Sequence, residues 1–244
     1  MSDDLNIAEL FHENTNIWPA QAGLDDEPLH EREDDFARIY LPPVEMVSSC
    51  GLEEAIMRRR SRRDFVRLAR LSPRVLSRLL RFSCSYTWQA DSDVELSRAM
   101  PSAGAVYPVD VYPIVFRVSG LPPGVYRYAA EDHSLELVRS GDFGDRLSAW
   151  MLNQPFIADA CVVFMFVGSN DRIAQHYGER GYRYLLIEAG HIAQNFCLVS
   201  TGLGLGSVTI GGFVDSGVNH LLRVDELTQI SLYGVAVGVL PNET

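Results

Sequence analysis

The sequence contains no lysine, because all 21 of its basic residues are arginines. This absence excludes Schiff-base chemistry and the phosphate-binding lysine of a P-loop, since both depend on a lysine amine. Acidic residues outnumber basic ones and give a net charge of −11. That charge argues against a general nucleic-acid-binding protein, which normally carries a basic face to neutralise phosphates.

Cysteine is also scarce, and Cys50, Cys84, Cys161 and Cys197 lie far apart in the chain. No CxxC pair or zinc-ligand spacing occurs, so we expect idle thiols in a reducing compartment and no metal site. The acidic start lacks the basic and apolar regions of a signal peptide. The longest apolar run, residues 160–168, is too short to span a bilayer. We therefore expect a soluble, cytoplasmic protein with no membrane partner.

The length of 244 residues and the apolar share of 47% are enough for one full hydrophobic core. Residues 1–50 are polar and irregular, with acidic residues gathered at 25–35. We expect this stretch to be an N-terminal arm, either solvated or packed along a partner subunit. Residues 51–244 then form the main domain.

Hydrophobic periodicity within the main domain predicts four helices and five strands. The first helix starts near Leu52 and the second at Ser72-Pro73, a third lies around 147–152, and the fourth spans about 183–200. The fourth is apolar over most of its circumference and should be central. The strands are predicted at 109–118, at 124–128 and 133–138 as a hairpin, at 160–167 and at 230–240.

Five arginines crowd into residues 58–63. Such density repels itself unless an anion neutralises it, and guanidinium groups bind phosphate through two hydrogen bonds, so the run is a candidate phosphate site. The alternative is a solvated helix end that pairs with carboxylates. Nucleic acid is a third option, which the overall charge disfavours.

Two further stretches present backbone rather than long side chains. Between Pro101 and Pro108 the residues are small enough to let the backbone approach a flat ligand, although a simple turn before a strand is the alternative. The glycine-rich segment 202–213 follows a helix, so it does not fit a Rossmann fingerprint. The segment either ends the helix in a turn or places its main chain against a flat ring of a ligand.

Four motifs, in this order, resemble the flavin-dependent nitroreductase superfamily, and most closely its branch of SagB-type or McbC-like dehydrogenases. They are RRSRRDF at 59–65, PSAGAVYPVDVY at 101–112, HYGERGYRYLLIEAGHIAQN at 176–195 and GLGSVTIGGF at 204–213. Members of this branch oxidise thiazoline and oxazoline rings in ribosomally made peptides. The resemblance implies an α+β, nitroreductase-like fold with a central, mostly antiparallel sheet flanked by helices, in an intertwined homodimer.

The resemblance also implies FMN as the cofactor, held by three groups of residues. The phosphate and ribityl groups would be held by Arg59, Arg60, Ser61 and Arg63. The isoalloxazine ring would be covered, from the opposite subunit, by Pro101, Ser102, Ala103 and Gly104. The other edge of the ring, near its reactive nitrogen, would be lined by Thr209, Ile210, Gly211 and Gly212.

A Lys-Tyr pair is associated with catalysis in this branch, and its best local match is His176-Tyr177, with histidine in place of lysine. Aromatising an azoline requires a base, because a proton leaves carbon while a hydride passes to the flavin. Neutral His176 accepts a proton near pH 7, and Tyr177 orients the ring or relays the proton. The alternatives are a surface histidine in a loop and a packed aromatic residue.

Together these observations predict an FMN-dependent azoline dehydrogenase, acting on a peptide whose rings a separate cyclodehydratase has formed. A second possibility is a NAD(P)H-dependent nitro or quinone reductase. A third is a catalytically idle scaffold subunit of a peptide-modifying complex, which the missing lysine keeps open.

Overall fold

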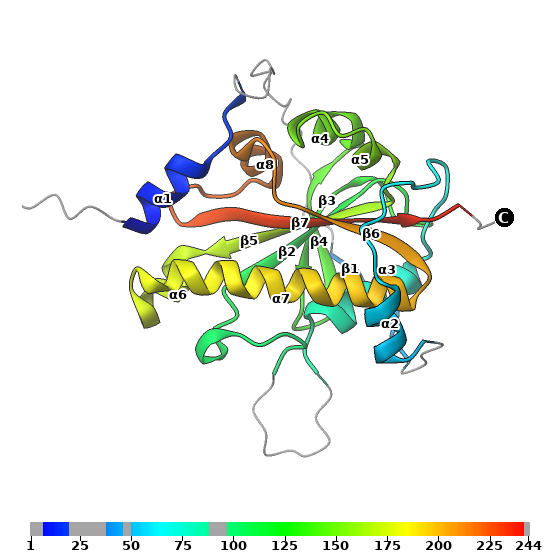
Figure 1. The fold of residues 1–244 in the computed structure, drawn as a ribbon, viewed down its shortest axis with the longest axis horizontal. Coiled ribbons are helices and arrows are strands. Elements are labelled where there is room, and N and C mark those ends of the chain that lie inside the picture. Colours follow the sequence, from blue (N-terminus) through cyan, green and yellow to red (C-terminus); the bar gives the residue numbers. More distant parts are fainter. Residues whose placement is uncertain (1–6, 20–37, 46–49, 88–96, 242–244) are drawn as a thin grey trace, which may run out of the picture.

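The computed structural model describes residues 7–19, 38–45, 50–87 and 97–241. In this part of the chain a seven-stranded sheet crosses the molecule, and helices cover both of its faces (Figure 1). Every pair of neighbouring strands is antiparallel. In spatial order the strands are β1 (Arg38–Tyr40), β4 (Ser134–Ser140), β3 (Gly124–Ala129), β2 (Val109–Val115), β5 (Val162–Ser169), β7 (Gln229–Val239) and β6 (Leu205–Ile210). The predicted α+β fold with a central antiparallel sheet is confirmed.

Strand β5 explains how the two hydrophobic cores are built. Its side chains alternate, so that Phe164 and Phe166 enter the core on one face while Val163 and Met165 enter the core on the other. Phe164 stacks on Phe196 with ring centroids 4.3 Å apart. Because both faces of the strand are buried, its sequence is an unbroken apolar run.

The helices divide between the two faces. On one face lie α3 (Pro73–Cys84), α6 (Asn170–Tyr177) and the long α7 (Arg180–Gly202), with α2 (Leu52–Arg58) beside the end of α7 (Figure 1). On the other lie α4 (Gly144–Trp150), α5 (Phe156–Asp159) and α8 (Asp215–Leu222). Among the described residues, none of the helices has the length and apolarity needed to cross a membrane.

The N-terminal residues are more regular than expected. Helix α1 (Ile7–Thr15) packs beside the main domain, where the His12 Nδ1 lies 3.3 Å from the Tyr182 hydroxyl. Beyond the helix, the Ile17 amide donates to the Asp215 carboxylate at 2.9 Å. The acidic stretch 25–35 lies outside the described residues, and the division of the chain at residue 50 remains a prediction.

Several elements of the main domain differ from the sequence-based expectation. Residues 205–210 form the edge strand β6 rather than a turn, and α5, α6 and α8 are additional helices. Helix α6 begins at a polar cap, where the Ser169 hydroxyl accepts from the Arg172 amide at 3.4 Å. Its His176 and Tyr177 therefore lie at a helix end and not in a loop.

Candidate functional site

The arginine-rich segment lies along the end of β6. Ser61 forms a β-bridge with Ser207, and the Arg62 amide donates to the Ser207 carbonyl at 2.9 Å. Farther on, the Val66 amide donates to the Val239 carbonyl, also at 2.9 Å. The predicted phosphate site and the glycine-rich segment are therefore neighbours in the fold, although about 140 residues separate them in sequence.

The five arginines of this segment have different surroundings. Arg58 pairs with Glu54 at 2.8 Å, and Arg62 forms a two-bond pair with Asp64 at 3.0 and 2.8 Å. The Arg62 guanidinium accordingly holds the pKa of the Asp64 carboxyl below its usual value. For these two arginines the expectation of carboxylate pairing on a solvated face is correct.

The remaining arginines are oriented by local contacts. Arg60 donates to the carbonyls of Met57 and Arg59 at 2.9 and 2.7 Å, so it caps the end of α2. The guanidinium carbon of Arg63 lies 5.6 Å from the centroid of the Phe156 ring. Arg59 is half-buried beside the exposed Ser61. Arg59, Ser61 and Arg63 are thus the members of the segment best placed to meet a ligand.

The residues after β6 bring backbone close to neighbouring side chains. A Cβ on Gly212 would lie 2.9 Å from Cδ1 of Leu152, and one on Gly211 would lie 3.2 Å from the ring of Tyr233. Thr209 is half-buried and Ile210 is buried. The segment Thr209–Gly212 therefore presents main chain rather than side chain at the end of the strand.

The loop after Met100 is a tight structure held by its own residues. Ala103–Ala105 form a 3-10 turn, and the Ser102 hydroxyl accepts from the Tyr107 amide at 2.9 Å. Gly104 has a φ of 59°, and Ala105 and Tyr107 also adopt positive φ angles of 53° and 49°. Non-glycine residues in that region cost about 1–3 kcal/mol each and are typical of functional loops.

The structure brings the predicted catalytic tyrosine to this loop. A Cβ on Gly104 would lie only 2.6 Å from the Tyr177 hydroxyl oxygen, so a larger residue at this positive-φ position would push the Tyr177 side chain away. The half-buried Tyr177 ring packs edge-on against Tyr184 with centroids 4.9 Å apart. His176 is exposed next to it, with its ring centroid 6.4 Å from that of Tyr177.

The loop and the arginine segment lie at opposite ends of α7 within one chain (Figure 1). The loop adjoins α6 and the first half of α7, whereas α2 and Arg59 adjoin the last turns, where Cys197 also lies. Between them α7 exposes Leu186 and Ile187, by 41% and 48%. A single chain therefore does not bring all the predicted flavin-binding residues together.

Glu188, which the sequence analysis did not identify, lies beneath the loop. Its side chain is only 2% exposed, and burial raises its pKa to about 7, although hydrogen bonds from Ser102 and the Val109 amide lower it. Two turns farther along α7, the Asn195 amide donates to the carbonyls of Ser83 and Ala99 at 3.1 and 3.2 Å. The sequence did contain a signal for this residue, because a glutamate stands among the apolar positions of the predicted central helix.

A model of the nitroreductase family matches residues 56–239. The chain belongs to the nitroreductase family. A nitroreductase-family protein of Methanocaldococcus jannaschii is 36% identical over 192 residues, covering 79% of this chain and 92% of that protein. The microcin B17-processing protein McbC of Escherichia coli is 31% identical over 147 residues, and this match covers 54% of the chain and 50% of McbC.

The fold also matches solved structures of this family. A chain of the Escherichia coli microcin synthetase McbBCD complex, solved with truncated pro-MccB17 bound, superimposes with a TM-score of 0.69. That match is 23% identical and covers 97% of this chain and 92% of the other. The predicted resemblance to the McbC-like branch of the nitroreductase superfamily is confirmed.

Proposed function

We propose that the protein is an FMN-dependent azoline dehydrogenase that works as a homodimer. Its substrate would be a peptide whose rings a separate cyclodehydratase has formed, and it would oxidise those rings to thiazole or oxazole. The observation that carries this proposal is the contact between Tyr177 and Gly104, which joins the candidate catalytic pair to the loop expected to cover the flavin. The relationship to McbC, a microcin-processing protein, supports a peptide substrate.

The residues around β6 are suited to FMN. Arg59, Ser61 and Arg63 supply donors for a phosphate and a ribityl chain, and Thr209–Gly212 offer main chain to the edge of a flat ring. Arg60 and Arg62 are engaged locally and contribute less. When bound, FMN supplies the hydride acceptor for the oxidation.

A homodimer would complete the site that one chain leaves divided. The exposed Leu186 and Ile187 give α7 an apolar strip suited to packing on a second copy. A two-fold axis across this strip would carry the Pro101–Gly104 loop and Tyr177 of one protomer toward the arginine segment of its partner. Each protomer would then contribute one half of each flavin site.

The chain's own residues would carry out the proton transfer. His176 is exposed, and its Nδ1 lies 3.3 Å from the Arg172 carbonyl, so Nε2 is the ring nitrogen that would accept the proton leaving the azoline carbon. Tyr177 is held by Tyr184 and by Gly104, and its hydroxyl can orient the ring or relay the proton. The Pro101–Gly104 loop would exclude water from one side.

The variants His176→Ala and Tyr177→Phe test the catalytic assignment. Each is expected to slow azoline oxidation by about 10²–10⁴-fold with FMN retained, because a positioned acid or base contributes that much. The rate is followed by mass spectrometry as the loss of H₂ per ring, with reduction of a nitroaromatic by NADPH as the control reaction. Normal peptide oxidation by both variants would overturn the assignment. A wild-type protein that takes up no FMN would instead favour the scaffold alternative.

The variants Arg59→Ala and Arg63→Ala test the flavin site. Each is expected to weaken FMN binding by about tenfold or more, since a hydrogen bond to a charged group contributes roughly 1.5–3 kcal/mol. The dissociation constant is measured from the quenching of FMN fluorescence. Arg67→Ala is the matched control, because Arg67 is exposed in the same stretch and lies 3.6 Å from Asp159. Equal affinities for all three variants and the wild type would mean that the run is only a solvated face.

A further inference from the structure

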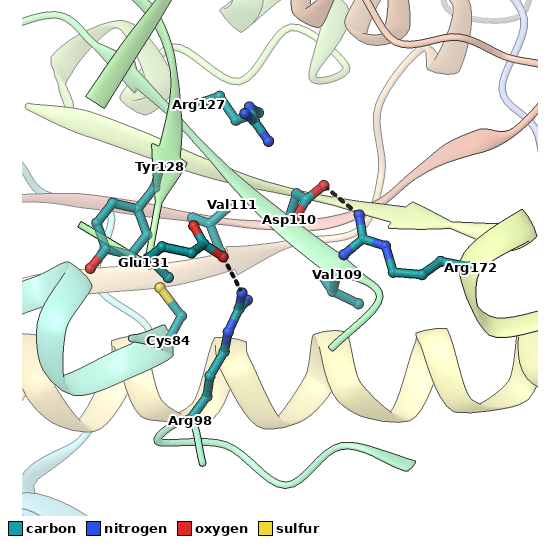
Figure 2. Close-up of a pocket in the computed structure, with 10 residues that line it drawn as sticks. Cys84, Arg98, Val109, Asp110, Val111, Arg127, Tyr128, Glu131 and Arg172 are labelled. Atoms are coloured by element: carbon teal, nitrogen blue, oxygen red, sulfur yellow. Dashed lines mark hydrogen bonds and ion pairs between the residues drawn. The ribbon is translucent and has the colours of Figure 1, made fainter. Parts of the chain in front are cut away.

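A charged cavity of about 340 Å³ is lined by residues of the 97–108 loop, of β2 and β3, and of helix α6. Figure 2 shows three arginines around it, which come from three different elements: Arg98 from the loop, Arg127 from β3 and Arg172 from α6. Val109 and Val111 of β2 form part of its floor. None of these arginines belongs to the flavin site proposed above.

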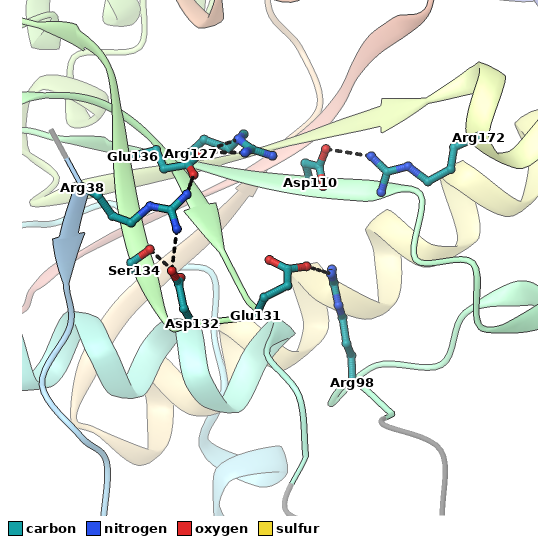
Figure 3. A network of polar contacts seen from close by, with 9 residues as sticks. All are labelled: Arg38, Arg98, Asp110, Arg127, Glu131, Asp132, Ser134, Glu136 and Arg172. Carbon is teal, nitrogen blue, oxygen red and sulfur yellow. Dashed lines mark hydrogen bonds and ion pairs between the residues drawn. The ribbon is translucent and has the colours of Figure 1, made fainter. Parts of the chain in front are cut away.

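Two of the three arginines are firmly engaged with the protein. Arg172 donates to the Tyr107 carbonyl at 2.9 Å and to Asp110 at 3.0 Å. Arg127 donates from Nε and from its terminal nitrogen to Glu136, which also pairs with Arg38, as Figure 3 shows. These contacts build the walls of the cavity.

Arg98 differs from the other two because its carboxylate partner is weakly held. Its side chain is only 11% exposed, and its guanidinium carbon lies 5.1 Å from the ring centroids of both Tyr86 and Tyr107. Within the described part of the chain its ion-pair partner is Glu131, at 3.2 Å, and the Glu131 side chain is 67% exposed. Among the described residues, the buried Nε of Arg98 has no hydrogen-bond acceptor. The guanidinium is thus fixed in place, while its partner is free to move into solvent.

The guanidinium of Arg98 is held in place while its carboxylate partner is exposed, so another carboxylate can replace Glu131. The aromatic contacts remove most of the entropy that Arg98 would lose on binding an anion. The pair is half-buried, because Arg98 is only 11% exposed while Glu131 is 67% exposed. Leaving the guanidinium without an anion would be costly, whereas exchanging Glu131 for an incoming carboxylate keeps the buried charge paired. Glu131 therefore occupies the position that a ligand carboxylate would take.

The cavity and the proposed reaction centre share a wall. Tyr107 accepts from the Arg98 amide at 3.0 Å through its hydroxyl and from Arg172 through its carbonyl, and it follows the Pro101–Gly104 loop directly. Helix α6 carries Arg172 toward the cavity and Tyr177 toward Gly104. An extended peptide bound in the cavity would therefore run along the Pro101–Gly104 loop.

We propose that the cavity binds a carboxylate of the peptide substrate, with Arg98 as the anchor and Glu131 as the internal group that the substrate displaces. This inference rests on the proposed function for the identity of the peptide, and it adds a subsite that selects acidic residues near the ring. The same guanidinium chemistry would also hold a phosphate, as in NADPH.

The test compares two fluorescent tripeptide amides, Gly-Glu-Gly and Gly-Gln-Gly, by fluorescence anisotropy on the FMN-loaded full chain. The glutamate peptide is expected to bind about tenfold more tightly, and Arg98→Gln should abolish this difference. Glu131→Gln should tighten the glutamate peptide by roughly two- to fivefold, because the internal competitor is lost. Arg67→Gln is the control for a general loss of positive charge.

Equal binding of the two peptides, or an unchanged affinity in Glu131→Gln, would overturn the inference. NADPH and unlabelled glutamate peptide are also compared as competitors of the labelled glutamate peptide. If NADPH displaces it at the lower concentration, the anion site belongs to a nucleotide phosphate, and the inference is overturned. Wild-type azoline oxidation would persist if only this inference failed. Carboxylate binding without any ring oxidation would instead contradict the proposed function alone.

Discussion

Replacement of Phe65 by alanine is expected to lower the free energy of unfolding by about 3–5 kcal/mol, the usual cost of truncating a buried phenylalanine, and to weaken FMN binding as well. Phe65 is only 8% exposed and lies over two glycines of neighbouring strands. A Cβ would lie 3.0 Å from its ring at Gly206 and 2.7 Å at Gly238. This packing fastens the arginine segment to β6 and β7.

Chemical denaturation gives the change in stability, and FMN fluorescence gives the change in affinity. Val66→Ala is the matched control, because Val66 is the next residue and is 39% exposed. The control should change the free energy of unfolding by less than about 1 kcal/mol. A Phe65→Ala variant as stable as the wild type would show that the segment is held by its backbone hydrogen bonds alone.

The variant Glu188→Gln is expected to remove a pH dependence of stability. Burial raises the pKa of Glu188 from 4.5 to about 7, so the folded state holds the proton more tightly than the unfolded state. The stabilisation is complete below pH 4.5 and is lost as the pH rises through about 7. The shift corresponds to about 3 kcal/mol. Glutamine resembles the protonated acid in shape but does not ionise.

Unfolding free energies measured at about pH 5 and about pH 8 should therefore differ more in the wild type than in Glu188→Gln. Glu179→Gln is the control, since Glu179 is exposed just before α7. An unchanged pH slope in Glu188→Gln would mean that other groups cause it. Loss of stability at both pH values would mean that the amide does not fit beneath the Pro101–Gly104 loop.

The sequence predicted those elements whose burial leaves a strong pattern. Strand β5 is buried on both faces, and helix α7 buries one broad face while exposing Leu186 and Ile187 on the other. Both therefore carry long apolar stretches, and both were found within a few residues. Strand β6 was missed because Gly202, Gly204 and Gly206 look like breaks in sequence. Only Gly206 of these three lies within the strand, where the packing of Phe65 and Leu240 leaves no room for a Cβ.

The candidate site was predictable only in parts. Composition and spacing indicated an arginine-rich anion site, and the family resemblance grouped it with the glycine-rich segment, whose proximity the Ser61–Ser207 bridge now shows. Nothing in the local pattern of Tyr177 indicated its contact with Gly104, because that contact depends on the turn between α6 and α7. The Arg98 cavity was missed since its arginines are isolated in sequence.

In the proposed homodimer, the length of helix α7 would decide how many protomers each flavin site needs. Its 23 residues span about 35 Å at 1.5 Å per residue, a length far greater than a three-ring cofactor. Under the proposed arrangement a single protomer carries one half of each of two flavin sites. Two complete sites form only when two protomers associate. Only the dimer would then be active. In dilute protein, where most protomers are monomeric, the activity would rise with the square of the protomer concentration.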